Sequence, residues 1–368
     1  QCRESREEKK GGGILLGKSL VTMTGSTKRQ CTSSSSNYPH AQSIPSLFLQ
    51  AARTNPSATA LDTAGGGPKM SYAQTACAAA RLGSSLREAG VKGGDVVGVC
   101  VAEGCEMVVV QLAVLLIGAA FSPIDLTLPA GRVAAMLSQI RSSCILVGDS
   151  DQGTLSAALT LFDHHQQQQH VQQQPPDPIP GGGTAEPPPS PPTSRPAVVG
   201  GVREAVFGRL DGGEDEGQGI ECAARLWSAA VDELGGDAPG GGICWVYFTS
   251  GTSGTPKGVL CPHQGATNYC LNHPLLPPPH QRGQHVRVLL LSAFSFDPSA
   301  GDAFAALTSG CVLCVASRTA LLSDLEGVIK ASECTHVCST PAVWSMLSGG
   351  KQGGNEWSLS AGGLGKLE

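Results

Sequence analysis

Hydroxyl-bearing residues and glycines crowd one short stretch of the chain, directly after an apolar run. Residues 249–258 read T-S-G-T-S-G-T-P-K-G and follow the β-branched and aromatic run 243–248. That run predicts a buried strand that ends at the stretch. The glycines allow close approach to a ligand, while the hydroxyls and the Lys257 ammonium supply hydrogen-bond donors. The stretch therefore predicts a loop that binds phosphate oxygens.

A flexible linker is the alternative interpretation of this stretch, because linkers use the same small residues. A linker has no reason to follow a strand, to place Pro256 before Lys257, or to continue into the helical pattern of residues 263–271. A Walker loop is a second alternative, but it needs glycine immediately before the lysine and Ser or Thr immediately after it. Pro256 and Gly258 occupy those positions, so we predict a phosphate loop of another kind.

The rest of the chain alternates between helix and strand patterns. Apolar spacing predicts helices at 44–52, 71–89, 106–117, 129–140, 263–271, 300–307, 322–331 and 342–347. Short apolar runs predict strands at 95–101, 120–123, 144–147, 243–248, 286–291, 311–315 and 336–338. Such alternation predicts an α/β fold with a mainly parallel sheet covered by helices on both faces.

Composition divides the chain into four parts. Residues 1–42 are expected to form a charged, disordered leader without the apolar stretch of a secretory signal, and residues 43–150 and 241–368 carry the alternating patterns. Residues 151–240 are rich in Gln, Pro and Gly, which predicts a largely disordered low-complexity insertion with a helix near 223–234. His164, His165 and His170 lie in that insertion, where solvated side chains are favoured over a metal site. Because the chain begins with Gln1 and its last αβ unit is cut short, we expect a fragment of a longer product.

Charge and cysteine usage narrow the class of protein. The net charge of −5 on 368 residues shows no basic stripe, which argues against nucleic acid or an anionic membrane as the partner. No apolar run approaches the roughly 20 residues of a membrane span. Most of the 14 cysteines are interpreted as reduced thiols of a cytoplasmic protein. Two pairs, 311/314 and 334/338, have a spacing that zinc could use, but their apolar runs favour buried strands, and we predict no metal ligands.

Four motifs together resemble the adenylate-forming (AMP-binding) superfamily, which includes acyl-CoA synthetases, luciferases and the adenylation domains of nonribosomal peptide synthetases. Residues 247–258 are similar to its signature phosphate loop. Residues 70–72, 116–125 and 296–299 are similar to three motifs of the amino-acid-activating branch, the last being Phe-Asp-x-Ser. The resemblance covers about 43–150 and 241–368. It implies two packed, mainly parallel sheets flanked by helices, interrupted by the insertion, with the C-terminal subdomain absent.

The resemblance implies ATP-dependent activation of an amino acid. Its carboxylate attacks the α-phosphorus of MgATP, pyrophosphate leaves, and an aminoacyl-adenylate forms. In the full-length relatives the acyl group then passes to a phosphopantetheine thiol on a carrier protein or carrier domain, which lies outside this chain. Two alternatives stay open. One is an acyl- or aryl-CoA ligase, which Asp297 disfavours because its substrate has no amine; the other is a catalytically dead domain that binds nucleotide or a partner.

The resemblance also assigns roles to residues. Lys257 would act as the catalytic residue by neutralising charge on the departing pyrophosphate. Asp297 would pair with the α-ammonium of the amino acid, although an N-cap for the following helix is the alternative. Gly301 in place of a bulky residue would leave room for a larger substrate side chain. The residues that would cradle the phosphates are Thr249, Ser250, Gly251, Thr252, Ser253, Gly254 and Lys257. The residues that would line the amino-acid site are Asp297, Gly301, Cys338, Ser360 and Gly362.

Three parts of the family pattern have no counterpart here. They are the Tyr-Gly-Pro-Thr-Glu-like segment that serves ATP and magnesium, the aspartate that binds ribose, and the lysine of the small C-terminal domain. We therefore expect the 368-residue chain alone to be inactive in adenylation.

Overall fold

The computed structural model describes residues 43–148, 152–172, 196–207, 216–234, 242–250, 255–273, 276–277, 282–339 and 343. Its helices are α1 (Ile44–Thr54), α2 (Tyr72–Glu88), α3 (Cys105–Leu116), α4 (Ala130–Ile140), α5 (Gln152–Gln172), α6 (Val202–Phe207), α7 (Glu216–Glu233), α9 (His263–Leu271), α10 (Pro298–Leu307), α11 (Arg318–Ser323) and α12 (Leu325–Ser332). Its strands are β1 (Thr59–Thr63), β2 (Lys69–Ser71), β3 (Val96–Cys100), β4 (Ala120–Pro123), β5 (Cys144–Val147), β6 (Ala197–Val199), β7 (Ile243–Thr249), β8 (Lys257–Pro262), β9 (Arg287–Leu289), β10 (Val312–Val315) and β11 (His336–Val337). Among the helices described, none combines the length and the apolar character of a membrane span.

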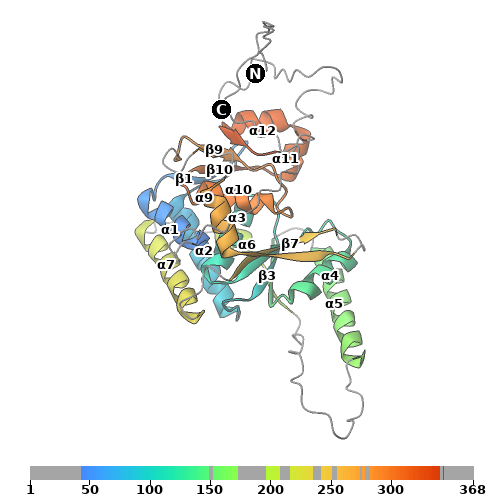
Figure 1. Cartoon of the computed structure of the whole chain (residues 1–368). Coiled ribbons are helices and arrows are strands. Elements are labelled where there is room, and N and C mark those ends of the chain that lie inside the picture. Colours follow the sequence, from blue (N-terminus) through green and yellow to red (C-terminus); the bar gives the residue numbers. More distant parts are fainter. Residues whose placement is uncertain are drawn as a thin grey trace, which may run out of the picture.

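The strands form two sheets. One has five strands in the order β11-β9-β10-β1-β2, and the other has six in the order β6-β5-β3-β4-β7-β8. Neighbouring strands run parallel, except in the pairs β1–β2 and β7–β8. The two sheets stack with helices between and outside them (Figure 1). The predicted α/β class with two mainly parallel, helix-flanked sheets is confirmed.

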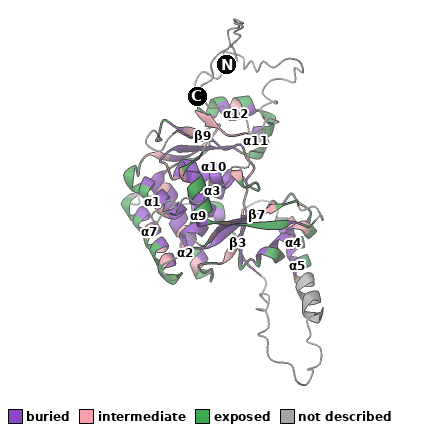
Figure 2. Ribbon diagram, viewed as in Figure 1, coloured by how far each residue is buried: buried purple, intermediate pink, exposed green. Residues whose placement is uncertain are grey.

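Side chains that alternate between the two faces of each strand build separate hydrophobic clusters. On β5, Cys144 and Leu146 face the central cluster with α1, α2, α3 and α10, while Ile145 and Val147 face α4 and α5. Strand β10 alternates in the same way between the central cluster and a third one under α11 and α12. This period of two, buried on both sides, explains why the strands read as continuous apolar runs. Figure 2 shows the resulting buried layers.

Local signals set the ends of the first two helices. Ser43 and Ser46 form a reciprocal capping box at the start of α1, and Ser71 and Gln74 form another at the start of α2. Each box satisfies backbone N–H groups that the first helical turn leaves without partners. Shortly after α2, Gly90 has φ +91°, a backbone conformation that favours glycine. The helix predicted at 71–89 therefore ends just before the backbone turn at Gly90.

Residues 151–240 hold more order than their composition predicted. Helix α5 continues through part of the glutamine run, to Gln172, and α7 is a long helix that packs along α2 (Figure 1). Ile220, Ala223, Trp227 and Ala230 of α7 are buried in the central cluster. Their spacing of three and four residues is the helical signal behind the helix predicted near 223–234, and α7 begins seven residues earlier, at Glu216. The expectation of a largely disordered insertion is therefore wrong for the described parts of this segment, while residues 173–195, 208–215 and 235–240 lie outside the described residues.

Two further elements differ from the prediction. The helix predicted at 322–331 is two short helices, because Asp324 ends α11 and caps α12 by accepting a hydrogen bond from the Gly327 N–H at 2.9 Å. Strand β8, directly after the phosphate-like loop, was not predicted, and its mostly exposed side chains lack a two-residue alternation. The helix predicted at 342–347 falls almost wholly outside the described residues.

Candidate functional site

A β-hairpin presents the predicted phosphate loop. Strands β7 and β8 pair antiparallel, with Thr249 opposite Lys257 at the end of the ladder where the loop begins. Thr249, Ser250 and Lys257 are exposed there, and the Thr249 hydroxyl donates across the hairpin to the Lys257 carbonyl oxygen at 3.5 Å. Residues Gly251, Thr252, Ser253 and Gly254 lie outside the described residues. The described ends of the loop thus bring the two hydroxyls and the ammonium to one edge of the six-stranded sheet.

Contacts from two other elements fix the base of this hairpin. The Gln139 side chain of α4 donates a hydrogen bond from Nε2 to the Pro256 carbonyl oxygen at 2.6 Å. Ser122 of β4 donates from Oγ to the Val246 carbonyl oxygen at 2.9 Å. Pro256 is buried while the adjacent Lys257 is exposed. The backbone is therefore anchored immediately before the lysine, which leaves its side chain available to a ligand.

Asp297 lies beside the same hairpin. It is exposed and occupies the N-cap position of α10, but its side chain makes no capping hydrogen bond. The Tyr247 hydroxyl of β7 lies 3.3 Å from Ser299 Oγ, which joins the Phe-Asp-x-Ser segment to the strand that carries the loop. Burial raises the pKa of Tyr247, and the negative charge of nearby Asp297 adds to that rise. Within the described residues the Asp297 carboxylate has no ion-pair partner, so it can receive a cation.

The space next to Gly301 is not open. A Cβ placed on Gly301 would lie 2.5 Å from Cε1 and 2.9 Å from Cδ1 of the Tyr269 ring. The glycine therefore makes room for Tyr269 of α9 instead of for a larger ligand. The prediction that Gly301 would enlarge the amino-acid site is therefore corrected. The space beside the glycine is filled by the side chain of Tyr269, from a helix that is distant in the sequence.

Polar groups that the motifs did not reveal surround that tyrosine. The Tyr269 hydroxyl donates to Oδ1 of Asp302 at 3.4 Å, and His273 Nε2 lies 2.8 Å from the same oxygen. Asp302 and His273 are both buried. Cys338 lies close enough to Asp302 to donate a hydrogen bond to it. Burial, and in second place the negative charge of Asp302, raise the pKa of Cys338 to about 11. Gly301 and Cys338 thus both lie near Tyr269, whereas Ser360 and Gly362 lie outside the described residues.

A cavity of about 310 Å³ lies between the two sheets. It is bordered by the loops that follow β3 and β4, by residues 293–295 and by Arg318. Ligands of open α/β sheets bind at the carboxyl ends of the strands, and these loops lie at that end of β3 and β4. The Phe294 N–H donates to Glu103 Oε1 at 3.3 Å, and burial raises the pKa of Glu103. The cavity therefore brings Pro123, Ile124 and Asp125, which end the motif 116–125, next to the residues that lead to Asp297.

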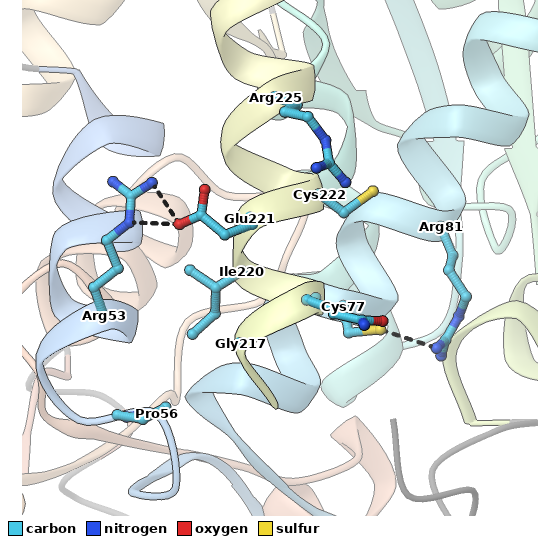
Figure 3. A pocket seen from close by; sticks show the side chains of 11 residues that line it. Arg53, Pro56, Cys77, Arg81, Gly217, Ile220, Glu221, Cys222 and Arg225 are labelled. Carbon is cyan, nitrogen blue, oxygen red and sulfur yellow. Dashed lines mark hydrogen bonds and ion pairs between the residues drawn. The ribbon is translucent and has the colours of Figure 1, made fainter. Parts of the chain in front are cut away.

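A wider hollow, about 900 Å³, lies on the outer face of α1, α2 and α7 (Figure 3). Arg53 there pairs with Glu221 at 3.1 Å, and Arg81 donates to the Cys77 sulfur at 3.1 Å. Figure 1 places these helices on the side of the molecule opposite the β7–β8 hairpin. The hollow shares no residue with the loop, with Asp297 or with the cavity between the sheets, and we do not assign it to the site.

The pattern of the AMP-binding enzyme family matches residues 48–365. The chain belongs to this family. Among curated proteins, the nonribosomal peptide synthetase atnA of Emericella nidulans is 27% identical to this chain over 78% of its length. This chain is 25% identical to tyrocidine synthase 3 of Brevibacillus parabrevis over 84% of the chain. The chain spans only 3% of atnA and 4% of tyrocidine synthase 3.

Solved structures show the fold of the same family. The N-terminal domain of FACL13 from Mycobacterium tuberculosis aligns with a TM-score of 0.57 at 20% identity, and the alignment covers 83% of this chain and 64% of the FACL13 domain. The peptide synthetase FmoA3, in a form bound to α-methyl-L-serine-AMP, aligns with a TM-score of 0.59 at 22% identity. This alignment covers 89% of the present chain and 29% of the FmoA3 chain. The described fold is thus that of the N-terminal part of adenylate-forming enzymes.

Proposed function

We propose that this chain carries the nucleotide- and substrate-binding part of an amino-acid-activating enzyme. The reaction is attack of an amino-acid carboxylate on the α-phosphorus of ATP, with release of pyrophosphate and formation of an aminoacyl-adenylate. Transfer of the acyl group to a phosphopantetheine thiol of a carrier protein or carrier domain would follow. The family membership and the peptide synthetase relatives support this class of reaction.

One observation carries the proposal for an amino acid in particular. The exposed Asp297 carboxylate, without an ion-pair partner in the described part of the chain, lies next to the strand that ends in the phosphate loop. The Tyr247–Ser299 contact of 3.3 Å holds the two motifs together. An amino acid carries an ammonium group, which would pair with Asp297, close to a carboxylate, which would react with the ATP held by the phosphate loop. An acyl or aryl substrate would leave the Asp297 charge unpaired.

The remaining residues receive roles by the same proposal. Lys257 neutralises charge that develops on the departing pyrophosphate, because an ammonium is a strong partner for phosphate oxygens. Thr249 and Ser250, with Gly251, Thr252, Ser253 and Gly254, hold the β- and γ-phosphates through hydroxyls and backbone N–H groups.

Magnesium enters the proposal together with the nucleotide. Within the described ranges no group of three His, Cys, Asp or Glu residues could hold a metal ion. Mg²⁺ commonly binds through one or two carboxylates and the phosphates of its substrate. We therefore assign Mg²⁺ mainly to the ATP phosphates, where it would offset their negative charge.

Binding of stable adenylate analogues tests the proposal on the 368-residue chain itself. The N-terminal subdomain of Klebsiella oxytoca NpsA, at 18% identity and a TM-score of 0.55, forms a complex with 3-hydroxybenzoyl-AMSN, which suggests such a measurement. Calorimetric titration would compare L-alanyl-, hexanoyl- and benzoyl-sulfamoyladenosine. We expect the aminoacyl analogue to bind at least about ten-fold more tightly than the other two, because only it offers a charge-assisted bond. Tighter binding of the hexanoyl or benzoyl analogue would favour an acyl- or aryl-CoA ligase, and equal binding would favour a domain that binds nucleotide alone.

A further inference from the structure

Tyr269 occupies the space that a glycine leaves on helix α10. Its Cε1 lies 2.5 Å and its Cδ1 2.9 Å from the position of a Cβ on Gly301, so the ring lies directly against the glycine backbone. Heavy atoms of neighbouring side chains do not approach a Cβ so closely, and any side chain at position 301 would displace the ring. The ring and the glycine therefore fit each other as a pair.

Two neighbours hold the ring in this place. The Tyr269 hydroxyl donates to Asp302 Oδ1 at 3.4 Å, and the His273 ring packs edge-on against it with centroids 5.1 Å apart. Asp302 is fixed in turn by His273 at 2.8 Å, and the side chains of both residues are only 2% exposed. Tyr269 as a whole remains 40% exposed. The side chain is thus anchored at its polar end and packed against the His273 ring, while part of Tyr269 stays accessible to a ligand.

The ring also lies close to the carboxylate that we assign to the ammonium group. Asp297 and Gly301 are four residues apart on α10, so they share one face of the helix. At 1.5 Å per residue, their Cα atoms are separated by roughly 6 Å along the helix axis. A ligand whose ammonium pairs with Asp297 and whose side chain follows this face meets Tyr269 within about one helical turn. That length accommodates the α-carbon and one or two further heavy atoms.

We propose that Tyr269 is a specificity-determining residue that limits the substrate to an amino acid with a small side chain, such as glycine, alanine or serine. The inference rests on the proposed function, since it takes Asp297 as the partner of the α-ammonium. It reverses the expectation from the sequence, in which glycine at position 301 would admit a larger side chain. A branched or aromatic side chain would have to displace a ring that Asp302 and His273 hold.

Calorimetric titration of the 368-residue chain with glycyl-, L-alanyl-, L-leucyl- and L-phenylalanyl-sulfamoyladenosine tests this size limit. We expect the wild-type chain to bind the alanyl analogue at least about ten-fold more tightly than the leucyl and phenylalanyl analogues. Side-chain carbons that do not fit an apolar site typically weaken binding by at least this factor. In Tyr269→Ala the leucyl analogue should gain about ten-fold while the alanyl analogue changes little. Tyr269→Phe, which keeps the ring, should retain the wild-type preference.

The ratio of the two dissociation constants separates a specificity role from a structural one, because general loss of folded protein lowers binding of both analogues alike. Tyr269→Ser provides a second variant if Tyr269→Ala does not fold. Equal binding of the alanyl and leucyl analogues by the wild-type chain would overturn the inference and leave the proposed function standing. An unchanged ratio in Tyr269→Ala and Tyr269→Ser would also overturn it. Failure of every aminoacyl analogue to bind the wild-type chain would overturn the proposed function and this inference together.

Discussion

Replacing Tyr72 by phenylalanine should destabilise the fold through a single atom. Tyr72 begins α2, is fully buried, and belongs to the motif 70–72. Its hydroxyl lies 2.7 Å from the Cys311 carbonyl oxygen and 3.1 Å from that of Leu307. The bond therefore joins α2 to the turn between α10 and β10, across more than 230 residues of sequence. This explains the tyrosine of the motif as a structural residue rather than one that binds substrate.

The contacts determine the size of the effect. Phenylalanine keeps the ring and its contact with Phe48, whose centroid lies 5.9 Å away. In the variant the Leu307 carbonyl oxygen still accepts a hydrogen bond from the Gly310 N–H at 3.4 Å. The Cys311 carbonyl oxygen loses the shorter bond, of 2.7 Å, from the Tyr72 hydroxyl. A buried acceptor left without its partner costs about 1–3 kcal/mol. We expect Tyr72→Phe to lower the free energy of unfolding by about 2 kcal/mol.

Urea unfolding of purified wild-type and variant chains, followed by circular dichroism, measures this difference. Tyr269→Phe is the matched control, because it removes the same atom from a side chain that is 40% exposed and whose hydroxyl makes a longer bond of 3.4 Å. We expect that control to change the free energy of unfolding by less than about 0.5 kcal/mol. Equal effects of the two substitutions, or no effect of Tyr72→Phe, would refute the assigned bond.

Three further predictions concern charge. Lys257→Ala should weaken ATP binding by at least about ten-fold in a calorimetric titration, while Lys330→Ala, which removes an exposed lysine paired with Glu326, should not. Burial lowers the pKa of His263 to about 4 in the folded chain, whereas the same imidazole in the unfolded chain takes up a proton near pH 6.5. Stability should fall by up to about 3 kcal/mol as the pH decreases from 6.5 to 4, and His263→Gln should remove that part of the dependence in urea titrations. Burial raises the pKa of Glu103, so stability should fall as the pH rises through its titration range, and Glu103→Gln should flatten that slope.

Much of the fold follows from local pattern. The strands at 120–123 and 144–147 and the helix at 263–271 have the bounds that the sequence predicts. Strands buried on both faces give uninterrupted apolar runs, and amphipathic helices give a period near 3.6, so both are visible locally. Strand β8 was missed because it is an edge strand with exposed side chains at most of its positions, including Val259 and Leu260.

The surroundings of the site depend on contacts that local pattern does not contain. The motifs predicted which stretches carry the phosphate loop and Asp297, and the structure places the described parts of both beside β7. Nothing near Gly301 in the sequence indicates that Tyr269, 32 positions earlier, fills the space beside it. The pairing of Asp302 with His273 is equally non-local, although a buried aspartate in the apolar helix α10 was a signal that an ionic or polar partner must exist.

In the proposed function, Asp297 receives the ammonium group of an amino acid. The most direct test compares L-alanyl-sulfamoyladenosine with propionyl-sulfamoyladenosine, which lacks only that group, on wild-type and Asp297→Asn chains by calorimetric titration. We predict that the wild-type chain prefers the alanyl analogue by at least about ten-fold, that Asp297→Asn loses this preference, and that the propionyl analogue binds both chains alike. The same preference in both chains would contradict this role of Asp297.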